Sequence, residues 1–227
     1  MKTKVILIAF VLSIALHGCE KPTFVDSSAD SFNLSKPPGP PPPPPDSEIV
    51  TINLSPIYQA SIGTFNESFF KYYPNNKTGN FYGERYRSYV YYDITTITNA
   101  RILSISASIT FSNTMYSGSG FATEFRDITT APFRFEDIDN GVIWYDILLG
   151  NNYGSIFIPH APGGGPTTVA WAGNSAVVQD FQTATNLHKT QFGIGKKSSR
   201  ENDSNMYTDV TFSNLTVTYK RPVNLQN

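Results

Sequence analysis

The sequence predicts an all-β protein: one antiparallel β-sandwich that carries a single short helix and follows a signal peptide and a proline-rich tether. Three observations lead to this fold class. Asn, Ser and Thr contribute 18, 22 and 22 of the 227 residues, a composition that suits strands and turns better than surface helices. Several segments alternate apolar and polar residues with a period of two, as half-buried strands do. Clusters of Gly, Asn and Pro separate these segments in the way that turns do.

The first segment of the chain is typical of an exported protein. Two lysines precede an apolar run of 12 residues at positions 5–16. Because a helix rises about 1.5 Å per residue, this run spans about 18 Å, whereas a bilayer core is about 30 Å thick. We therefore expect a signal peptide over residues 1–18 and not a membrane-spanning helix.

The end of this segment resembles the lipobox of bacterial lipoproteins. Leu16 and Gly18 stand at the third and first positions before Cys19, the single cysteine of the chain. The resemblance implies cleavage before Cys19, attachment of acyl chains such as palmitate to its thiol, and acylation of the new amino group. Glu20 follows in place of the aspartate that retains such proteins in the inner membrane, which implies the outer membrane or the cell surface of a bacterial envelope. The alternative is ordinary secretion that leaves Cys19 as a free thiol.

Residues 19–47 are expected to form a lipidated linker. Prolines occupy eight of the nine positions from 37 to 45. Since proline fixes φ and donates no N–H, this run predicts a polyproline II helix, which extends about 28 Å at about 3.1 Å per residue. We interpret the run as a stalk that lifts the following domain off the lipid surface; the alternative is a ligand for a proline-recognition domain.

The folded domain is predicted to span residues 48–222, with a short tail at 223–227. Strands are expected at residues 48–54, 86–92, 105–111, 122–128, 142–149, 155–158, 191–195 and 210–219. The strict alternation of the third strand places four residues inside the sandwich: Ile105, Ala107, Ile109 and Phe111. In the second strand, the face of Val90 and Tyr92 is the expected interior. One helix is expected after Ser175, the predicted cap, because apolar residues recur every three or four positions between 177 and 187.

Two regions of this domain resemble the DNRLRE-type sandwich module. Residues 87–95 stand where that family has R-x-L-x-F-D-L-S, and residues 100–102 and 105–111 stand where it has A-x-I-x-x-A-x-L. Residues 192–198 and 215–219 correspond to its glycine-rich strand and its final L-x-V-x-Y. The resemblance implies a jelly-roll-like sandwich on a bacterial surface that binds polysaccharide or has a structural role. It carries over no catalytic residue.

Most common chemical sites have no counterpart in the sequence. One cysteine forms neither an internal disulfide nor a cysteine-based zinc site. The net charge is −1 and no basic block is present, which argues against nucleic-acid binding. His160 and His188 lack metal-ligand spacing, and we expect no cofactor. Asp137 and Asp139 resemble part of a calcium turn, so a structural calcium ion is one interpretation and a plain polar turn is the other.

Carboxylates offer the only enzymatic alternative. Six of them crowd into one segment: Glu124, Asp127, Glu136, Asp137, Asp139 and Asp146. Paired carboxylates can serve glycoside hydrolysis. Surface carboxylates at this density are nevertheless ordinary, so we expect that the protein is not an enzyme.

Aromatic residues are the exceptional feature of the composition. They make up 14% of the chain, and eight of the 13 tyrosines fall between positions 58 and 92. Adjacent aromatic residues in a strand point to opposite faces, so some must lie outside the core, where rings can stack on sugars. Tyr72, Tyr73, Trp144 and Trp171 are therefore the candidate ligand-binding residues. Burial in the core is the alternative, above all for Trp144.

Together these features predict a non-enzymatic, lipid-anchored protein of the cell envelope whose sandwich binds glycan or another extracellular polymer. A structural or adhesive protein that contacts other surface proteins through sheet edges is the alternative. A glycoside hydrolase that uses the carboxylates between positions 124 and 146 is the second alternative.

Overall fold

The computed structural model describes residues 46–115, 120–128, 140–158 and 165–223. The chain divides into two units, Met1–Pro43 and Pro44–Asn227, and every described residue lies in the second. The predicted signal peptide, Cys19 and nearly all of the predicted tether therefore lie outside the described residues. Within the described ranges, neither helix has the length and apolar character needed to cross a membrane.

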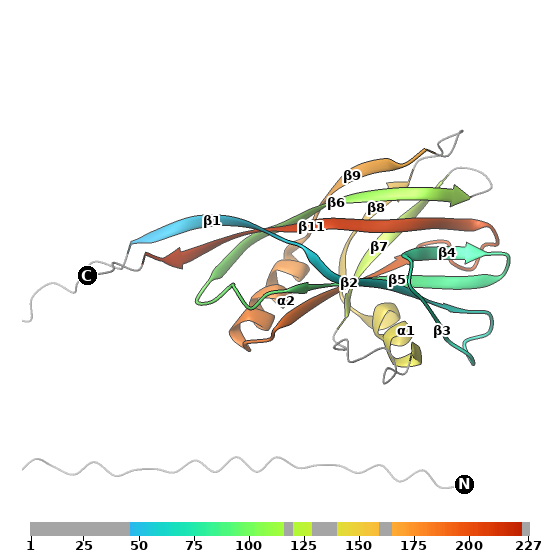
Figure 1. The fold of residues 1–227 in the computed structure, drawn as a ribbon, viewed down its shortest axis with the longest axis horizontal. Coiled ribbons are helices and arrows are strands. Elements are labelled where there is room, and N and C mark those ends of the chain that lie inside the picture. Colours follow the sequence, from blue (N-terminus) through green and yellow to red (C-terminus); the bar gives the residue numbers. More distant parts are fainter. Residues whose placement is uncertain (1–45, 116–119, 129–139, 159–164, 224–227) are drawn as a thin grey trace, which may run out of the picture. The chain divides into compact units, whose positions relative to one another are not determined.

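Eleven strands and two helices make up the described part of the domain (Figure 1). The strands are β1 (Ser47–Leu54), β2 (Pro56–Thr64), β3 (Lys71–Tyr73), β4 (Lys77–Phe81), β5 (Glu84–Asp93), β6 (Arg101–Met115), β7 (Phe121–Ile128), β8 (Asn152–Ile158), β9 (Thr167–Ala172), β10 (Gln191–Ser198) and β11 (Met206–Pro222). The helices are α1 (Asn140–Leu149) and α2 (Ser175–Asn186). Every pair of neighbouring strands among them is antiparallel.

The strands form one continuous sheet that folds into two packed layers. Their order is β8-β7-β10-β5-β4-β11-β6-β9, with β1 beside β11 and the β2–β3 pair beside β5. β5 connects the layers, because its start pairs with β4 and its end pairs with β10. Val90 and Ile194 from one layer share a buried core with Ile109 and Val217 from the other. This arrangement confirms the predicted all-β class and the antiparallel sandwich.

The strand β6 shows why alternation predicts this sheet well. Its four predicted interior residues are all buried: Ile105, Ala107, Ile109 and Phe111. The strand β5 differs, because both of its faces are buried. Val90 and Tyr92 face the main core, as predicted, whereas Tyr89 and Tyr91 belong to a second core on the opposite face of the same layer.

The second core is covered by α1, and the strand predicted at residues 142–149 is wrong. Ile143, Trp144 and Ile147 of α1 are fully buried in this core. An apolar run of this length does not distinguish a buried strand from a buried helix, which explains the error. The close approach of the helix depends on Gly195 of β10, where a Cβ atom would lie 2.6 Å from the Ile147 side chain.

The second helix, α2, is the one that the sequence predicts, but its cap is Asn174 and not Ser175. The Asn174 side chain accepts hydrogen bonds from the backbone N–H groups of Ala176 and Val177, as an N-cap residue does. Phe181 carries the helix into the main core, where its ring lies 4.7 Å from that of Phe192. Because α2 meets β6, β8 and β10, it packs against strands of both layers.

Four described strands, β2, β3, β4 and β9, are not among the predicted ones. The turn between β4 and β5 explains part of this result, because Tyr82 has a φ of 50° there, a conformation that glycine and asparagine usually supply. The opposite end of the domain is formed by β1 and β11, where Ser47 pairs with Pro222. The polypeptide therefore enters and leaves the sandwich at neighbouring points (Figure 1).

Candidate functional site

Exposed aromatic side chains gather at the end of the domain opposite Ser47. Phe65, Phe69 and Tyr82 are 68%, 83% and 70% exposed. Phe65 and Phe69 lie in the loop between β2 and β3, and Tyr82 lies in the turn between β4 and β5 (Figure 1). We call these three residues and Tyr145 of α1 the distal aromatic surface.

One ion pair and two ring contacts connect the parts of the distal aromatic surface. Glu67, in the β2–β3 loop, forms a 3.0 Å ion pair with Arg85 at the start of β5. This pair connects the loop to the strand that follows the β4–β5 turn, which carries Tyr82. Phe70 meets the Trp144 ring at 5.8 Å and the Tyr145 ring at 6.0 Å, and so joins the same loop to α1. The exposed rings are thus carried by three elements that are tied to one another.

The predicted ligand residue Tyr73 is half-buried and is held by contacts with β4 and β5. Its hydroxyl donates a 2.5 Å hydrogen bond to Glu84 Oε1, and Tyr86 donates to the other oxygen at 2.6 Å. Burial, followed by the Glu84 hydrogen bond, raises the pKa of Tyr73 to about 12. The ammonium groups of Lys71 and Lys77 lie 5.2 and 5.1 Å from its ring centroid. These contacts occupy the hydroxyl and the ring of Tyr73, so it is not an open stacking platform.

The other predicted ligand residues are more deeply placed. Tyr72 is half-buried and packs against the second core. Trp144 is fully buried in that core, and Trp171 is 2% exposed in the main core. Burial of Trp144 is the alternative that the sequence left open. The two indoles are therefore not brought together, and neither presents a ring face to solvent.

All four residues of the surface were missed by the sequence reasoning: Phe65, Phe69, Tyr82 and Tyr145. A signal exists for Phe69, because Phe69 and Phe70 are adjacent, and neighbouring side chains in extended chain point to opposite sides. No sequence pattern marks Phe65 or Tyr82. Their exposure follows from the loops in which they lie.

The predicted carboxylate segment is only partly assembled in the structure. Asp137 and Asp139, the calcium candidates, lie outside the described residues. Glu124 forms an ion pair with Arg126. Asp127 lies near Asp180 of α2, which the sequence reasoning did not select, and both contact the Tyr153 hydroxyl. Across the part of the chain that the structure describes, no group of three or more His, Cys, Asp or Glu side chains has the arrangement of a metal site.

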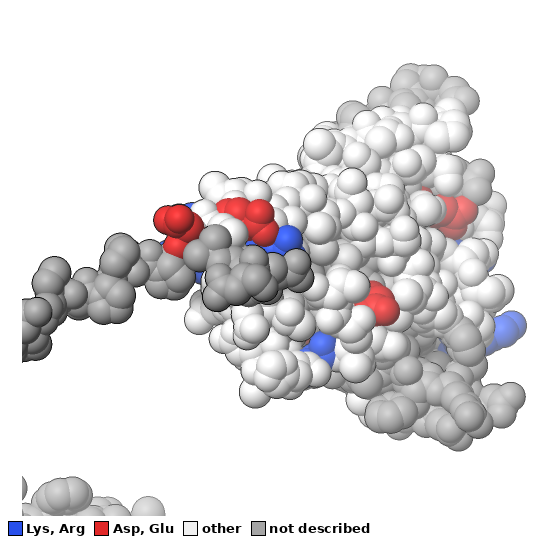
Figure 2. Space-filling view, turned by 60° about the vertical axis from the view of Figure 1, so that its left-hand side comes forward, with Lys and Arg blue, Asp and Glu red and all other residues white. Residues whose placement is uncertain are grey.

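Charged side chains are sparse on one face of the domain. Figure 2 shows that Lys, Arg, Asp and Glu are sparse and scattered over the face that it presents, in keeping with a chain of which 15% is charged.

Comparisons with known proteins leave the chain without an assigned family. No protein-family model matches it, and a search of curated proteins finds no significant match. The resemblance to the DNRLRE-type module stays a prediction; it involves residues 87–95, 100–102, 105–111, 192–198 and 215–219.

Proposed function

We propose that this protein is a non-enzymatic, lipid-anchored component of a bacterial cell envelope whose β-sandwich binds glycan. The observation that carries the proposal is the distal aromatic surface, in which Phe65, Phe69 and Tyr82 are at least 68% exposed at one end of the sandwich. Aromatic rings held open to solvent in this way provide apolar faces for the C–H groups of sugar rings.

The position of this surface supports the proposal. The strand β11 pairs with β4 next to Tyr82 at its start and with Ser47 at its end. Since a strand rises about 3.3 Å per residue, its 17 residues place the two ends about 55 Å apart. The proposed stalk joins the domain at the Ser47 end, so the distal aromatic surface lies at the far end from that junction.

The experiment is a glycan array with the full-length chain in detergent, followed by titration of each glycan that binds. We expect Phe69→Ala and Tyr82→Ala each to weaken binding by about three- to tenfold, the loss typical of one aromatic contact. Ile49→Ala is the matched control, because Ile49 is 64% exposed but lies on β1 at the opposite end. Absence of saturable binding, or equal affinities for all variants, would remove the basis of the proposal.

A specific observation favours one second candidate, an adhesive protein that contacts other proteins. Besides Tyr145, α1 exposes the aliphatic residues Val142 and Leu149, which are 52% and 80% exposed. Aliphatic side chains do not stack on sugars, and exposed apolar patches often mark protein interfaces. If this candidate is correct, Leu149→Asp reduces the yield of cross-links between this protein and other proteins on intact cells, whereas glycan binding by the same variant is unchanged.

A further inference from the structure

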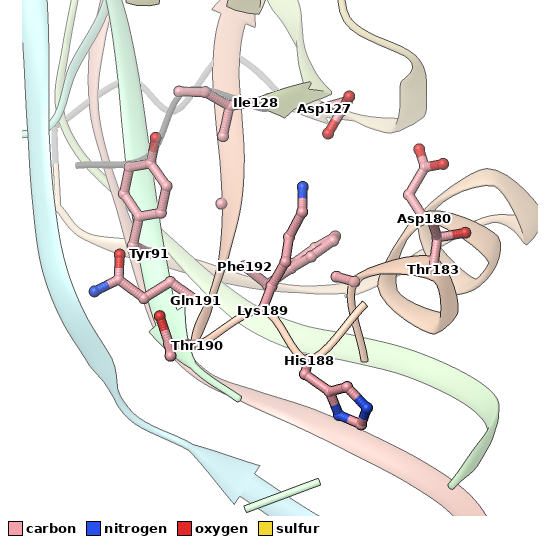
Figure 3. Close-up of a pocket in the computed structure, with 12 residues that line it drawn as sticks. Tyr91, Asp127, Ile128, Asp180, Thr183, His188, Lys189, Thr190, Gln191 and Phe192 are labelled. Atoms are coloured by element: carbon pink, nitrogen blue, oxygen red, sulfur yellow. The ribbon is translucent and has the colours of Figure 1, made fainter. Parts of the chain in front are cut away.

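A pocket of about 530 Å³ lies apart from the distal aromatic surface. It is bounded by the end of α2 and the residues after it, by the start of β10, and by the ends of β5 and β7 (Figure 3). Ile128 and Phe192 supply apolar walls, and the Tyr91 ring closes one side. A volume of this size is in the range of small-molecule sites, which are about 300–1,000 Å³.

One wall of the pocket carries two carboxylates that share a single hydroxyl. Tyr153 Oη lies 2.9 Å from Asp127 Oδ1 and 3.1 Å from Asp180 Oδ2. A phenol has one proton and donates to one carboxylate at a time, so the second carboxylate has capacity left for another donor. Asp180 also accepts a 3.0 Å hydrogen bond from the Asn151 amide, which orients it toward β8.

The surroundings of this wall disfavour the charged form of the Asp127 carboxylate. Burial raises the pKa of Asp127, and the nearby carboxylates of Asp180 and Asp146 raise it further, against the hydrogen bond from Tyr153. A cationic group placed at this wall reverses the effect of the neighbouring carboxylates. The wall therefore suits an ammonium group.

The opposite charge is supplied by Lys189. In Figure 3 its side chain rises from the segment after α2 and points into the pocket. Its backbone N–H donates to Ala184 O at 3.0 Å, directly after His188 with a φ of 52°, so the start of the side chain is fixed by the helix end. Within the described ranges the Lys189 ammonium takes part in no hydrogen bond or ion pair.

We propose that this pocket binds a small zwitterion with an apolar body, of the α-amino-acid or dipeptide class. The ligand's ammonium lies at Asp127 and Asp180, its carboxylate lies at Lys189, and its side chain packs on Ile128 and Phe192. A purely cationic ligand leaves the lysine charge unopposed, and a purely anionic ligand meets two carboxylates. A ligand that carries both charges matches both the two carboxylates and the lysine.

The test is calorimetric titration of the full-length chain in detergent with four probes that share one apolar body. Leucine and leucyl-leucine carry both charges, leucinamide carries only the ammonium, and N-acetyl-leucine carries only the carboxylate. We expect saturable binding of at least one zwitterion, and about tenfold weaker binding of both singly charged probes, the usual effect of losing one charged contact. A comparison of the affinities for leucine and leucyl-leucine shows whether the pocket prefers a free amino acid or a dipeptide. Equal binding of all four probes, or no saturation by either zwitterion, would overturn the proposal.

Two variants test the roles of the carboxylates and of Lys189 separately. Asp180→Asn is expected to weaken binding of leucinamide and both zwitterions about tenfold and not to weaken binding of N-acetyl-leucine. Lys189→Met is expected to weaken binding of N-acetyl-leucine and both zwitterions about tenfold and not to weaken binding of leucinamide. Lys220→Met is the control, since Lys220 is an exposed lysine on β11 outside the pocket. Lys189 is exposed, so its replacement is compatible with folding even if Asp180→Asn is not. Unchanged zwitterion affinity in folded Lys189→Met would contradict the proposal. Glycan binding at the distal aromatic surface is measured separately, so either idea can fail alone.

Discussion

Arg87 and Glu201 form a two-point ion pair inside the domain, although they are 114 residues apart in the chain. Arg87 Nε lies 3.0 Å from Glu201 Oε2, and Arg87 Nη2 lies 2.5 Å from Glu201 Oε1. The third nitrogen, Nη1, donates to the Trp144 carbonyl at 2.8 Å, and the guanidinium lies 3.9 Å from the Trp144 ring centroid. One arginine of β5 thus fixes both α1 and the loop before β11.

Glu201→Gln is expected to reduce the free energy of unfolding by about 3–5 kcal/mol, because it leaves a buried guanidinium without its counter-ion. Urea unfolding followed by circular dichroism measures the change. Glu67→Gln is the matched control: its partner Arg85 and Glu67 itself are 20% and 35% exposed at the side chain, and such pairs contribute less than about 1 kcal/mol. Equal losses in the two variants would show that burial of the first pair has no energetic consequence.

Lys196 gives the stability of the domain a dependence on pH. It is fully buried, donates to Val210 O at 2.9 Å and lies 5.1 Å from the Phe212 ring centroid. Burial lowers its pKa from 10.5 to about 7. Since the folded state then binds fewer protons than the unfolded state between these values, the free energy of unfolding rises with pH across that window, by up to about 1.4 kcal/mol per pH unit.

Lys196→Met is expected to increase stability near pH 7 and to flatten this rise between pH 7 and 9.5, as seen in urea unfolding at a series of pH values. The range stops below 10, because burial raises the pKa of Tyr91 and Tyr92, whose ionisation acts in the opposite direction at higher pH. An identical pH profile for the variant and the natural chain would contradict this account.

Gly195→Ala tests the packing of α1 on the sheet. The added Cβ would lie 2.6 Å from Ile147 Cγ1, so the helix must shift or the isoleucine must change its rotamer. We expect a loss of about 1–3 kcal/mol, the usual cost of overpacking. Gly165→Ala is the control, because an added Cβ there meets no atom within 4 Å. If thermal unfolding shows the same midpoint for both variants, α1 does not depend on the glycine.

Cys19→Ala tests the proposed anchor. Each buried methylene of an acyl chain contributes about 0.8 kcal/mol to membrane binding, so loss of the acylated cysteine should move the protein from the membrane fraction to the soluble fraction. Metabolic labelling with a palmitate analogue checks the modification directly. Ser13→Ala, a change in the same predicted signal peptide, should leave both readouts unaltered. Labelling or membrane retention that persists in Cys19→Ala would refute the anchor.

Much of the fold was predictable from local pattern. Where one face of a strand is buried and the other is wet, as in β6, alternation names the interior residues, and the turn residues mark the ends. The prediction failed at α1, where both sides of the segment are apolar. The sheet buries one side of α1, and the other side is also apolar. The sequence therefore shows an apolar run without a helical or a strand period. β4 was missed because it is short and because the turn after it places Tyr82 at a positive φ, where a tyrosine does not mark a turn in the sequence.

The sequence by itself determined the antiparallel β class, the faces of the regular strands and the position of α2, because these follow from the local spacing of apolar residues. It also contains the apolar run with Cys19 and the proline run, on which the anchor proposal rests. Only the tertiary structure decided which aromatic residues are exposed, since Trp144 and Phe69 are both large aromatic residues and yet one is buried and the other exposed. It also brought Asp127 beside Asp180 and Arg87 beside Glu201. Contacts between residues so distant in the chain follow from strand order and layer packing, which no local pattern specifies.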